Sequence, residues 1–427
     1  MINILKQEIN WKTTAYDGEL LNKINKILTM NLKIICLNII KTFPNVISIY
    51  LTQSFSRGEG SVLVENENIS VLSDYDILVI SDAPFYLLQL RKKEFENSFS
   101  PCELNNIEPM PGHPIVDLKV RNVQQIMNLP PSLFKHELKT AVCVYGSELL
   151  RPSLKINLEK IPATEGLSLL FNRMLGALIP FHINFLNSDL NEIQHRHLTF
   201  ESVKLVSGCR DALLILDKFF GLTEKEKQEH FQYMLNTKYR RLNKKFPELI
   251  VLSEKAYLYR IKPYRELERE ALTLWFRSHQ ITSEVLQLYF SKLYNIKGNN
   301  WLEIIDKLMM KNYYDYYYRL YSKFSSFLLK IKKPQEVEIS FELNRILLAL
   351  ILLLFSVGEK GINNLLLNKT KKIVGLNKSY QQIRDDVKEL WTFLKELVCS
   401  NYVTPLTPPT SLSTKLQTLI ANMMSLG

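Results

Sequence analysis

The feature that most constrains the fold of this chain is a set of three short apolar runs with polar residues placed in or beside them. The first run, residues 46–51, leads into a turn that begins near Gln53. The second begins at Asp74-Tyr75-Asp76, and the third, PIVDLKV, contains Asp117. Short apolar runs bounded by turn residues are typical of buried strands. The sequence therefore predicts a small sheet that carries acidic side chains.

The three aspartates predict a metal site on this sheet. Asp74 and Asp76 are two residues apart, and side chains alternate between the faces of a strand, so both project from the same face. Asp117 on a neighbouring strand completes a three-carboxylate cluster, whose hard oxygen ligands suit Mg²⁺ held together with substrate phosphates. The alternative is that Asp74 and Asp76 only cap an exposed strand start. Against it, Asp is disfavoured in strands, and acids beside apolar strand cores need a reason.

The composition is that of an ordered globular protein with anionic partners. Of the 427 residues, 46% are hydrophobic and 23% are charged, and a chain of this length can form two or three domains. The formal net charge of +11 favours nucleotides, nucleic acid or an acidic membrane surface as partners. Five cysteines without CxxC spacing indicate reduced thiols, so we expect a cytoplasmic protein.

No membrane insertion is expected. The first dozen or so residues carry charges where a secretory signal needs an apolar segment. The most apolar segment, residues 346–357, is too short for a membrane span, which needs roughly twenty residues. We therefore predict a buried core helix over 346–357.

The order of the predicted elements gives an α+β fold. Helices are predicted over about 20–42 and 84–98, and residues 59–73 read as a loop. Four strands are predicted, over 46–51, 75–81, 114–120 and 141–147. From Thr164 onward the pattern is mainly helical, over 164–187, 198–220, 223–236, 247–259, 265–277, 281–294, 299–309, 312–331, 338–357 and 379–399. The prediction is a small mixed sheet with flanking helices, followed by a large all-α region. The predicted domains are 1–160, 161–300 and 301–427.

The polar residues near the first strands suit nucleotidyl transfer. That reaction needs an enzyme to hold a triphosphate, neutralise its charge and activate an acceptor oxygen, and two metal ions bridged by carboxylates do the last two jobs. Asp74 and Asp76 would bind the metal on the triphosphate, and Asp117 would complete the metal on the acceptor side. A turn with Ser54, Ser56 and Gly58 can present N–H and hydroxyl groups to phosphates. Arg57 adds a charged donor.

These residues resemble the signature of the nucleotidyltransferase superfamily of the DNA polymerase beta type. That signature is a Gly-Ser turn, an Arg-Gly-Glu common in minimal members, a Ser-Asp-x-Asp, and a lone Asp on the next strand. Ser54 falls on the serine, Arg57-Gly58-Glu59 on the Arg-Gly-Glu, Ser73–Asp76 on the metal-binding pair and Asp117 on the third acid. The resemblance covers about residues 45–121. It implies a nucleotide site that includes Ser54, Ser56, Arg57, Gly58 and Glu59.

Two positions depart from the family pattern. Gln53 stands where the family usually has Gly, so the turn before Ser54 is expected to differ in shape. The interval from Ser54 to Asp74 is longer than in the smallest members, which implies an extra turn or an extended loop.

The resemblance also implies a lysine from the helical part. Several two-domain nucleotidyltransferases hold the triphosphate with a Lys on the first helices after the sheet. Lys204 is the candidate here, and it shares a helix face with Asp211, seven residues on. Asn172 and Arg173 on the preceding helix are further candidates. A surface lysine or a salt bridge between helices is the competing interpretation for Lys204.

The expected function is Mg²⁺-dependent transfer of a nucleoside monophosphate from an NTP to an acceptor hydroxyl or amine, with release of pyrophosphate. Two Mg²⁺ ions are expected, and Mn²⁺ could replace them. The acceptor stays open between a small molecule, a protein side chain, RNA and a second nucleotide. One alternative is an oligonucleotide or cyclic-dinucleotide signalling synthase. The other is a nucleotide- or RNA-binding protein with a degenerate site, which the substituted Gln53 leaves open.

Overall fold

A computed structural model of the chain gives its fold as two compact units. The residues that the structure describes are 15–66, 68–108, 110, 114–150, 157–310, 345–359, 361–374 and 386–403. The first unit contains the described residues up to Phe181 together with Asp189–Asn295, and the second contains His182–Ser188 and the described residues from Ile296 onward. The three-part division predicted from the sequence stays a prediction.

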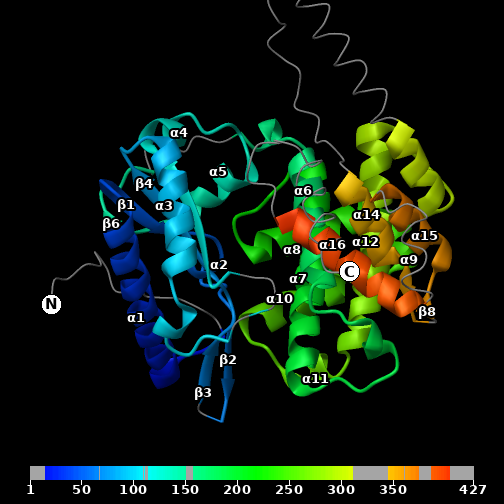
Figure 1. Cartoon of the computed structure of the whole chain (residues 1–427), viewed down its shortest axis with the longest axis horizontal. Coiled ribbons are helices and arrows are strands. Elements are labelled where there is room, and N and C mark those ends of the chain that lie inside the picture. The colour runs from blue at the N-terminus through cyan, green and yellow to red at the C-terminus, as the bar shows by residue number, and fades with distance from the viewer. Residues whose placement is uncertain are drawn as a thin grey trace, which may run out of the picture. The chain divides into compact units, whose positions relative to one another are not determined.

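A four-stranded mixed sheet forms the centre of the first part of the chain (Figure 1). Its strands are β1 (Val46–Leu51), β4 (Tyr75–Ser81), β5 (Val116–Asn122) and β6 (Val142–Gly146). In space they follow the order β5-β4-β1-β6. Strand β4 runs parallel to β5, and β1 runs antiparallel to both β4 and β6. All four strands lie close to the ranges predicted from their apolar runs, and the small mixed sheet is confirmed.

The two faces of the sheet have different neighbours. Tyr75, Ile77 and Val79 of β4 are buried in a core with residues of α1 (Gly18–Thr42) and α3 (Phe85–Ser98). The alternate residues Leu78 and Ile80 pack on the opposite face, in a second core that includes residues of α4 (Val123–Met127) and the 3₁₀ turn η2 (Leu138–Thr140). Asp76 shares this second face because side chains alternate along a strand.

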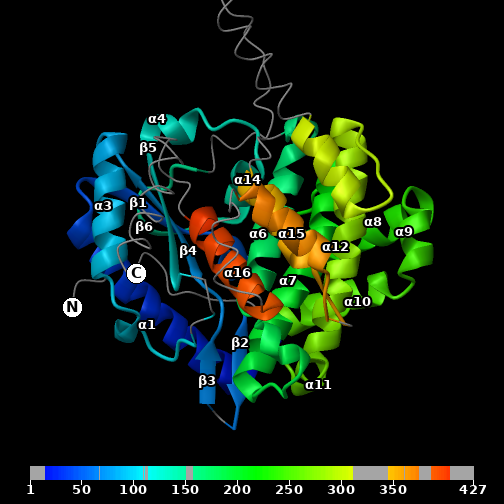
Figure 2. The ribbon, with the colours of Figure 1, turned by 45° about the vertical axis from the view of Figure 1, so that its right-hand side comes forward.

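The prediction of a loop over residues 59–73 is wrong. Strands β2 (Val62–Glu65) and β3 (Asn68–Val71) pair there as an antiparallel hairpin, which Figure 2 shows extending beyond the end of the four-stranded sheet. Val62 and Val71 are buried partners in the hairpin. Polar residues around the turn, where Asn66 has a φ of 48°, interrupt the apolar alternation. Each strand is thus too short for its pattern to stand out.

The helical part of the first unit is built around one long helix, α7 (Glu192–Leu216), which packs against α6 (Thr164–Leu178), α10 (Leu249–Ile261) and α12 (Ala271–Tyr294). The remaining helices of this unit are α2 (Gln53–Ser56), α5 (Leu133–Glu137), α8 (Glu224–Thr237), α9 (Arg240–Lys245) and α11 (Arg265–Glu268). Helix α7 begins before the predicted residue 198, because the Asn191 side chain accepts from the backbone N–H of Gln194 in a capping box. The two helices predicted over 265–277 and 281–294 are instead the short α11 and the continuous α12.

One buried arginine joins the hairpin to the helices. Arg196 of α7 is 7% exposed, and its guanidinium donates to Glu108 at 3.0 and 3.1 Å and to Glu65 of β2 at 3.2 Å. Its Nε lies 3.5 Å from a carboxylate oxygen of Glu268 on α11. Three acids from separate elements therefore meet on one cation.

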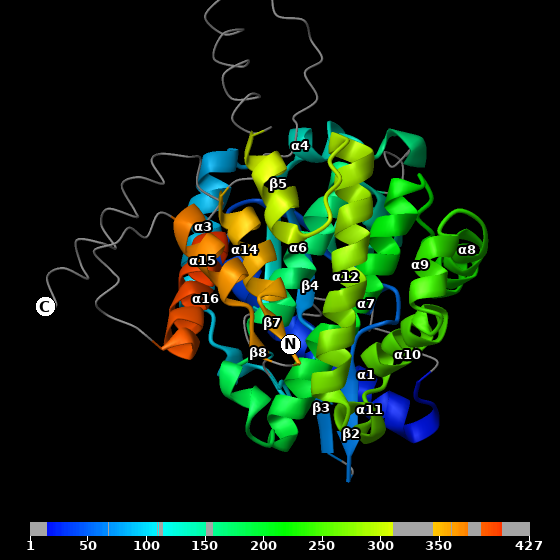
Figure 3. The same ribbon diagram turned by 90° about the vertical axis from the view of Figure 1, so that its right-hand side faces the viewer.

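The second unit is helical in its described residues, apart from one very short hairpin. Helices α14 (Arg345–Phe355), α15 (Asn364–Ile373) and α16 (Val387–Val403) pack together, as Figure 3 shows in orange and red. Strands β7 (Val357–Gly358) and β8 (Gly361–Ile362) pair between α14 and α15, and residues 301–310 form a further helix. Leu348 to Leu354 are buried, so the predicted core helix is confirmed. No helix among the described residues is long and apolar enough to cross a membrane. The helix predicted over 312–331 lies outside them.

A buried histidine in α12 predicts acid sensitivity of the fold. His279 is 4% exposed against Trp275, and neither of its ring nitrogens has a hydrogen-bond partner among the described residues. Burial lowers the pKa of His279 to about 3. Between pH 6.5 and 3 the unfolded chain therefore binds a proton that the folded chain does not, and stability decreases as the pH falls. Replacing His279 by Leu should reduce the loss of unfolding free energy between pH 7 and 5 by about 2 kcal/mol.

Urea unfolding at the two pH values measures this difference. Thr273 is exposed on the same helix, so Thr273→Leu is the control and should leave the pH dependence as in the parent chain. An unchanged pH dependence in His279→Leu would mean that this imidazole takes up a proton in the folded chain.

Candidate functional site

A cavity of about 350 Å³ lies between the sheet and the helices of the first unit. Its wall contains six of the residues predicted from the sequence, namely Ser54, Arg57, Asp74, Asp76, Asp117 and Lys204. Asn172 and Arg173, the two further candidates, line it as well. Ser56, Gly58 and Glu59 do not belong to the lining. Residues about 150 positions apart along the chain therefore meet in one cavity, so the site is built jointly by the sheet and the helices.

The strand register places two of the carboxylates side by side. Asp76 of β4 pairs directly with Asp117 of β5 in the parallel register, and neighbouring strands lie about 4.8 Å apart. Asp74 and Asp76 both line the cavity, while Tyr75 between them is buried in the opposite core. The period-two argument thus holds for all three acids, although Asp74 lies one residue before β4 begins.

Two of the three carboxylates already have partners within the chain. Asp76 is 6% exposed, and its Oδ1 accepts a hydrogen bond of 2.6 Å from Nε2 of Gln53. Asp117 Oδ2 lies 3.3 Å from Nζ of Lys119, which is two residues further along β5 on the same face. Asp74 has no hydrogen bond or ion pair of its side chain among the described residues.

The three aspartates place several negative charges close together on the sheet side of the cavity. Burial raises the pKa of Asp76 well above its usual value; the charges of Asp74 and Asp117 raise it further, and only Lys119 among the nearest groups lowers it. Burial acts against the charge of Lys119, but Asp117 and Asp76 outweigh it, so the pKa of Lys119 is raised. A cation between the carboxylates would relieve their repulsion.

The donor set suits a divalent metal, but the side chains are not arranged around one. Carboxylate oxygens are the ligands that Mg²⁺ takes in proteins. In the described part of the chain, however, no three His, Cys, Asp or Glu side chains converge as a metal-binding group. Asp76 is engaged with Gln53 and Asp117 with Lys119, which accounts for part of this. The residues thus fit Mg²⁺ in chemistry, and a metal would have to displace these two partners.

The predicted phosphate-binding residues lie in the turn after β1, with Ser54 and Ser56 in the single helical turn α2 and Arg57, Gly58 and Glu59 directly after it. Gln53 has a φ of +55°, in the left-handed region that favours glycine. The Ser56 hydroxyl donates to the Gln53 carbonyl at 2.8 Å, so it stabilises the turn and does not face the cavity. The Ser54 residue lines the cavity. Gly58 has a φ of +77°, which explains a glycine at this position.

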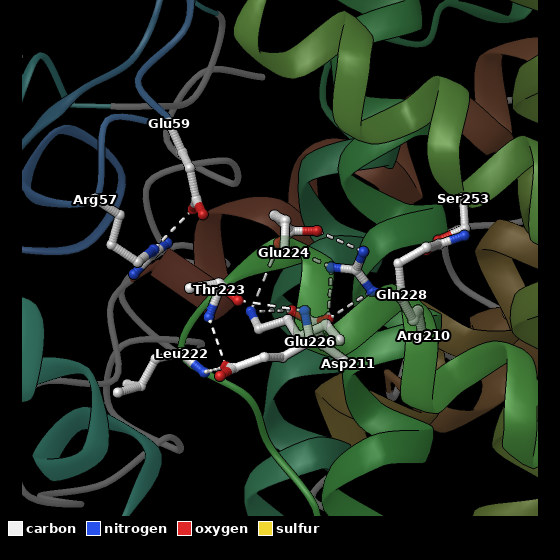
Figure 4. Close-up of polar contacts among 11 residues, drawn as sticks. Arg57, Glu59, Arg210, Asp211, Leu222, Thr223, Glu224, Glu226, Gln228 and Ser253 are labelled. Carbon is white, nitrogen blue, oxygen red and sulfur yellow. Dashed lines mark hydrogen bonds and ion pairs between the residues drawn. The ribbon is translucent and has the colours of Figure 1, made fainter. Parts of the chain in front are cut away.

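Glu59 acts on the site through Arg57. The Arg57 Nε donates to Glu59 Oε2 at 2.7 Å, and both side chains are largely buried (Figure 4). Burial alone would lower the pKa of Arg57, but Glu59 and other nearby acids raise it. The predicted Arg-Gly-Glu sequence is thus a buried ion pair at the edge of the cavity.

Four cations of the described helices line the cavity, namely Arg173, Lys204, Lys227 and Arg260. Lys204 of α7 lies 3.3 Å from Glu201, and burial lowers its pKa. Arg173 of α6 and Arg260 of α10 also line the cavity, and neither guanidinium has a hydrogen bond or ion pair among the described residues. Burial lowers the pKa of Arg260, and Arg173 lowers it further. The two arginines are partly buried and close enough to affect each other, and such a pair of cations is suited to bind an anion.

The sequence interpretation missed Arg260. It stands in the run YLYRI, at the end of a helix predicted from its apolar spacing. The only sign of Arg260 in the sequence was a charged residue beside apolar ones. Nothing in the sequence indicated which end of this helix would lie next to the sheet.

A buried charge network, also missed, forms the far wall (Figure 4). Arg210 of α7 donates to Glu224 at 2.5 and 3.0 Å and lies 2.8 Å from Asp211, while Lys227 of α8 lies 3.3 Å from Asp211. Burial would raise the pKa of Asp211, but Arg210 and Lys227 lower it to about 2. Asp211, Glu224 and Lys227 line the cavity. The shared face of Lys204 and Asp211 was the sequence signal for this wall.

Comparison of the sequence with models of known protein families and with curated proteins gives no match.

Proposed function

We propose that this chain is a nucleotidyltransferase of the DNA polymerase beta type, which uses Mg²⁺ and an NTP. One observation carries the proposal: a single cavity has three aspartates on its sheet side, and Arg173, Lys204 and Arg260 line its helix side next to the network of Asp211, Glu224 and Lys227. A Mg²⁺-bound triphosphate needs both kinds of group, carboxylates for its metal and cations for its remaining phosphate oxygens. The adjacent positions of Asp76 and Asp117 on parallel strands agree with the fold of that superfamily.

Each residue then has a definite task. Asp74 and Asp76 would hold the metal on the triphosphate, and all three aspartates would hold the metal on the acceptor side. When bound, Mg²⁺ neutralises phosphate charge and lowers the pKa of the acceptor hydroxyl. Arg173, Lys204 and Arg260 donate hydrogen bonds to phosphate oxygens, and Ser54 contributes a hydroxyl at the turn. The chain thereby orients the triphosphate so that its α-phosphorus faces the acceptor.

The test is incubation with each NTP, labelled at the α-phosphate, with Mg²⁺ or Mn²⁺ and a cell extract. Transfer of label to a component of the extract, with release of one pyrophosphate per label, is the expected result. Label in a dinucleotide made from NTPs alone would instead support the signalling synthase.

One observation favours the second candidate, a nucleotide-binding protein without turnover. The Gln53 amide engages Asp76, the carboxylate that the reaction needs most. Tight Mg²⁺-dependent NTP binding, without label transfer to any acceptor in a broad screen, would support this candidate over the enzyme.

Replacing Arg260 by Met should raise the KM for the NTP by about tenfold or more, because a hydrogen bond from a charged donor to phosphate is lost. The fold should remain intact, since burial already disfavours the charge on this side chain. Initial rates of pyrophosphate release against NTP concentration measure the change. Arg269 is exposed on the surface, and Arg269→Met is the matched control, expected to leave KM unchanged. Equal KM values in both variants would place the triphosphate elsewhere.

A further inference from the structure

Gln53 holds an unusual position in the candidate site. Its backbone adopts a φ of +55°, which is uncommon for a residue with a side chain. Its carbonyl is fixed by the Ser56 hydroxyl at 2.8 Å and by the Arg57 N–H at 3.2 Å. With the backbone held in this way, the side chain reaches across to Asp76, and its Nε2 lies 2.6 Å from Oδ1. The amide is therefore hydrogen-bonded to a buried carboxylate oxygen.

The neighbouring carboxylate is engaged in the same manner. Lys119 Nζ lies 3.3 Å from Asp117 Oδ2. A hydrogen-bond donor thus sits on each of the two paired acids, and each donor takes an oxygen that a metal would ligate. Lys119 supplies positive charge to the crowded acids, whereas the neutral Gln53 amide supplies only a hydrogen bond.

We propose that the Gln53 amide is an internal occupant of the metal position at Asp76, and that it makes divalent-metal binding dependent on nucleotide. In the free protein the metal must displace this hydrogen bond. When a triphosphate enters with its metal, phosphate oxygens next to the turn at Ser54 offer the amide a new acceptor, so the amide can leave Asp76 without losing a hydrogen bond. The inference rests on the proposed function, because it assigns the triphosphate to this cavity.

The consequence is a difference in metal affinity between the free and the nucleotide-bound protein. Removing the amide should tighten Mn²⁺ binding to the free protein by about tenfold, as expected for loss of a competing hydrogen bond to a charged group. In the presence of a non-hydrolysable NTP analogue, the same change should alter Mn²⁺ affinity by less than about threefold.

Gln53→Gly is the suitable variant, because glycine adopts the left-handed backbone without strain. Gln53→Asn is the second variant: it also tolerates this backbone, but its shorter side chain brings the amide back from Asp76. Gln124 is exposed on α4, and Gln124→Ala is the control. Free Mn²⁺ is followed by electron paramagnetic resonance with the whole chain, with and without the analogue, and urea midpoints verify the fold.

Tighter Mn²⁺ binding by Gln53→Gly and Gln53→Asn, seen only without nucleotide, supports the inference. Equal Mn²⁺ affinity of Gln53→Gly and the parent chain without nucleotide overturns it, as does a failure of Gln53→Gly to bind Mn²⁺ at all. The proposed function can fail separately. If Gln53→Gly binds Mn²⁺ more tightly as expected, but the parent chain transfers no label from any NTP, the metal position at Asp76 is supported and the nucleotidyltransferase activity is not.

Discussion

Replacing Asp76 by Asn is expected to reduce pyrophosphate release from NTPs by about a thousandfold or more. Asp76 contributes to both proposed metal positions, and an amide oxygen is a much weaker ligand than a carboxylate for the ions that neutralise the triphosphate. The fold should not suffer. Burial raises the pKa of Asp76, and the charges of Asp74 and Asp117 raise it further, so a negative charge at this position is disfavoured in the folded chain. Removing that charge should leave the free energy of unfolding unchanged or raise it.

Asp82 provides the matched control for this experiment. It lies just past the other end of β4 and is exposed. Asp82→Asn should keep parental turnover and stability. Turnover by Asp76→Asn within about tenfold of the parent chain would exclude the proposed mechanism, whereas lost turnover with a lowered urea midpoint would point to misfolding.

Replacing Arg210 by Met is expected to lower the free energy of unfolding by about 3 kcal/mol or more. The Arg210 side chain is 1% exposed, and it neutralises Glu224 and Asp211 inside the first unit. Taking away one partner of a buried ion pair leaves uncompensated charge, which costs far more than the intact pair contributes. Urea unfolding at pH 7 measures the loss.

Two further variants separate this effect from a change in packing. In the double variant Arg210→Met with Glu224→Leu, the remaining Asp211 and Lys227 still balance each other, so much of the stability should return. The exposed pair Lys245–Glu284 is the surface control, and Lys245→Met should cost less than about 1 kcal/mol. A loss in Arg210→Met as small as in Lys245→Met would mean that water reaches the network.

The sheet and its acids could be predicted because strand chemistry is local. An apolar run of six or seven residues is enough to predict a strand. The alternation of side chains along that strand then placed Asp74 and Asp76 on one face and Tyr75 on the other. The hairpin β2–β3 was missed for the converse reason. Its strands have four residues each, too few for alternation to be distinguished from a polar loop.

The helix-side residues of the cavity depend on tertiary packing, which the sequence does not report. Helical periodicity gave α6, α7 and α10, but no local rule states which helix end points toward the sheet. Lys204 was identified through a family resemblance, and Arg260 was not identified at all. The hydrogen-bond partners of Asp76 and Asp117 could not be predicted from the sequence either. Whether Gln53 meets Asp76 depends on a positive φ, and glutamine gives no signal for that conformation.

The ion pairs of Arg196 determine where this chain can be shortened without leaving buried charge unpaired. Its guanidinium joins Glu65 and Glu108, from the sheet half, to Glu268 from the helical half. A fragment that stops near residue 160 would keep the three aspartates but lose every helix-borne cation, and it would expose two acids without their shared counter-charge. The sheet half therefore depends on the helices for part of its charge balance and for one wall of the cavity. A shortened chain meant to keep the cavity should therefore extend to Asn295, where the first unit ends.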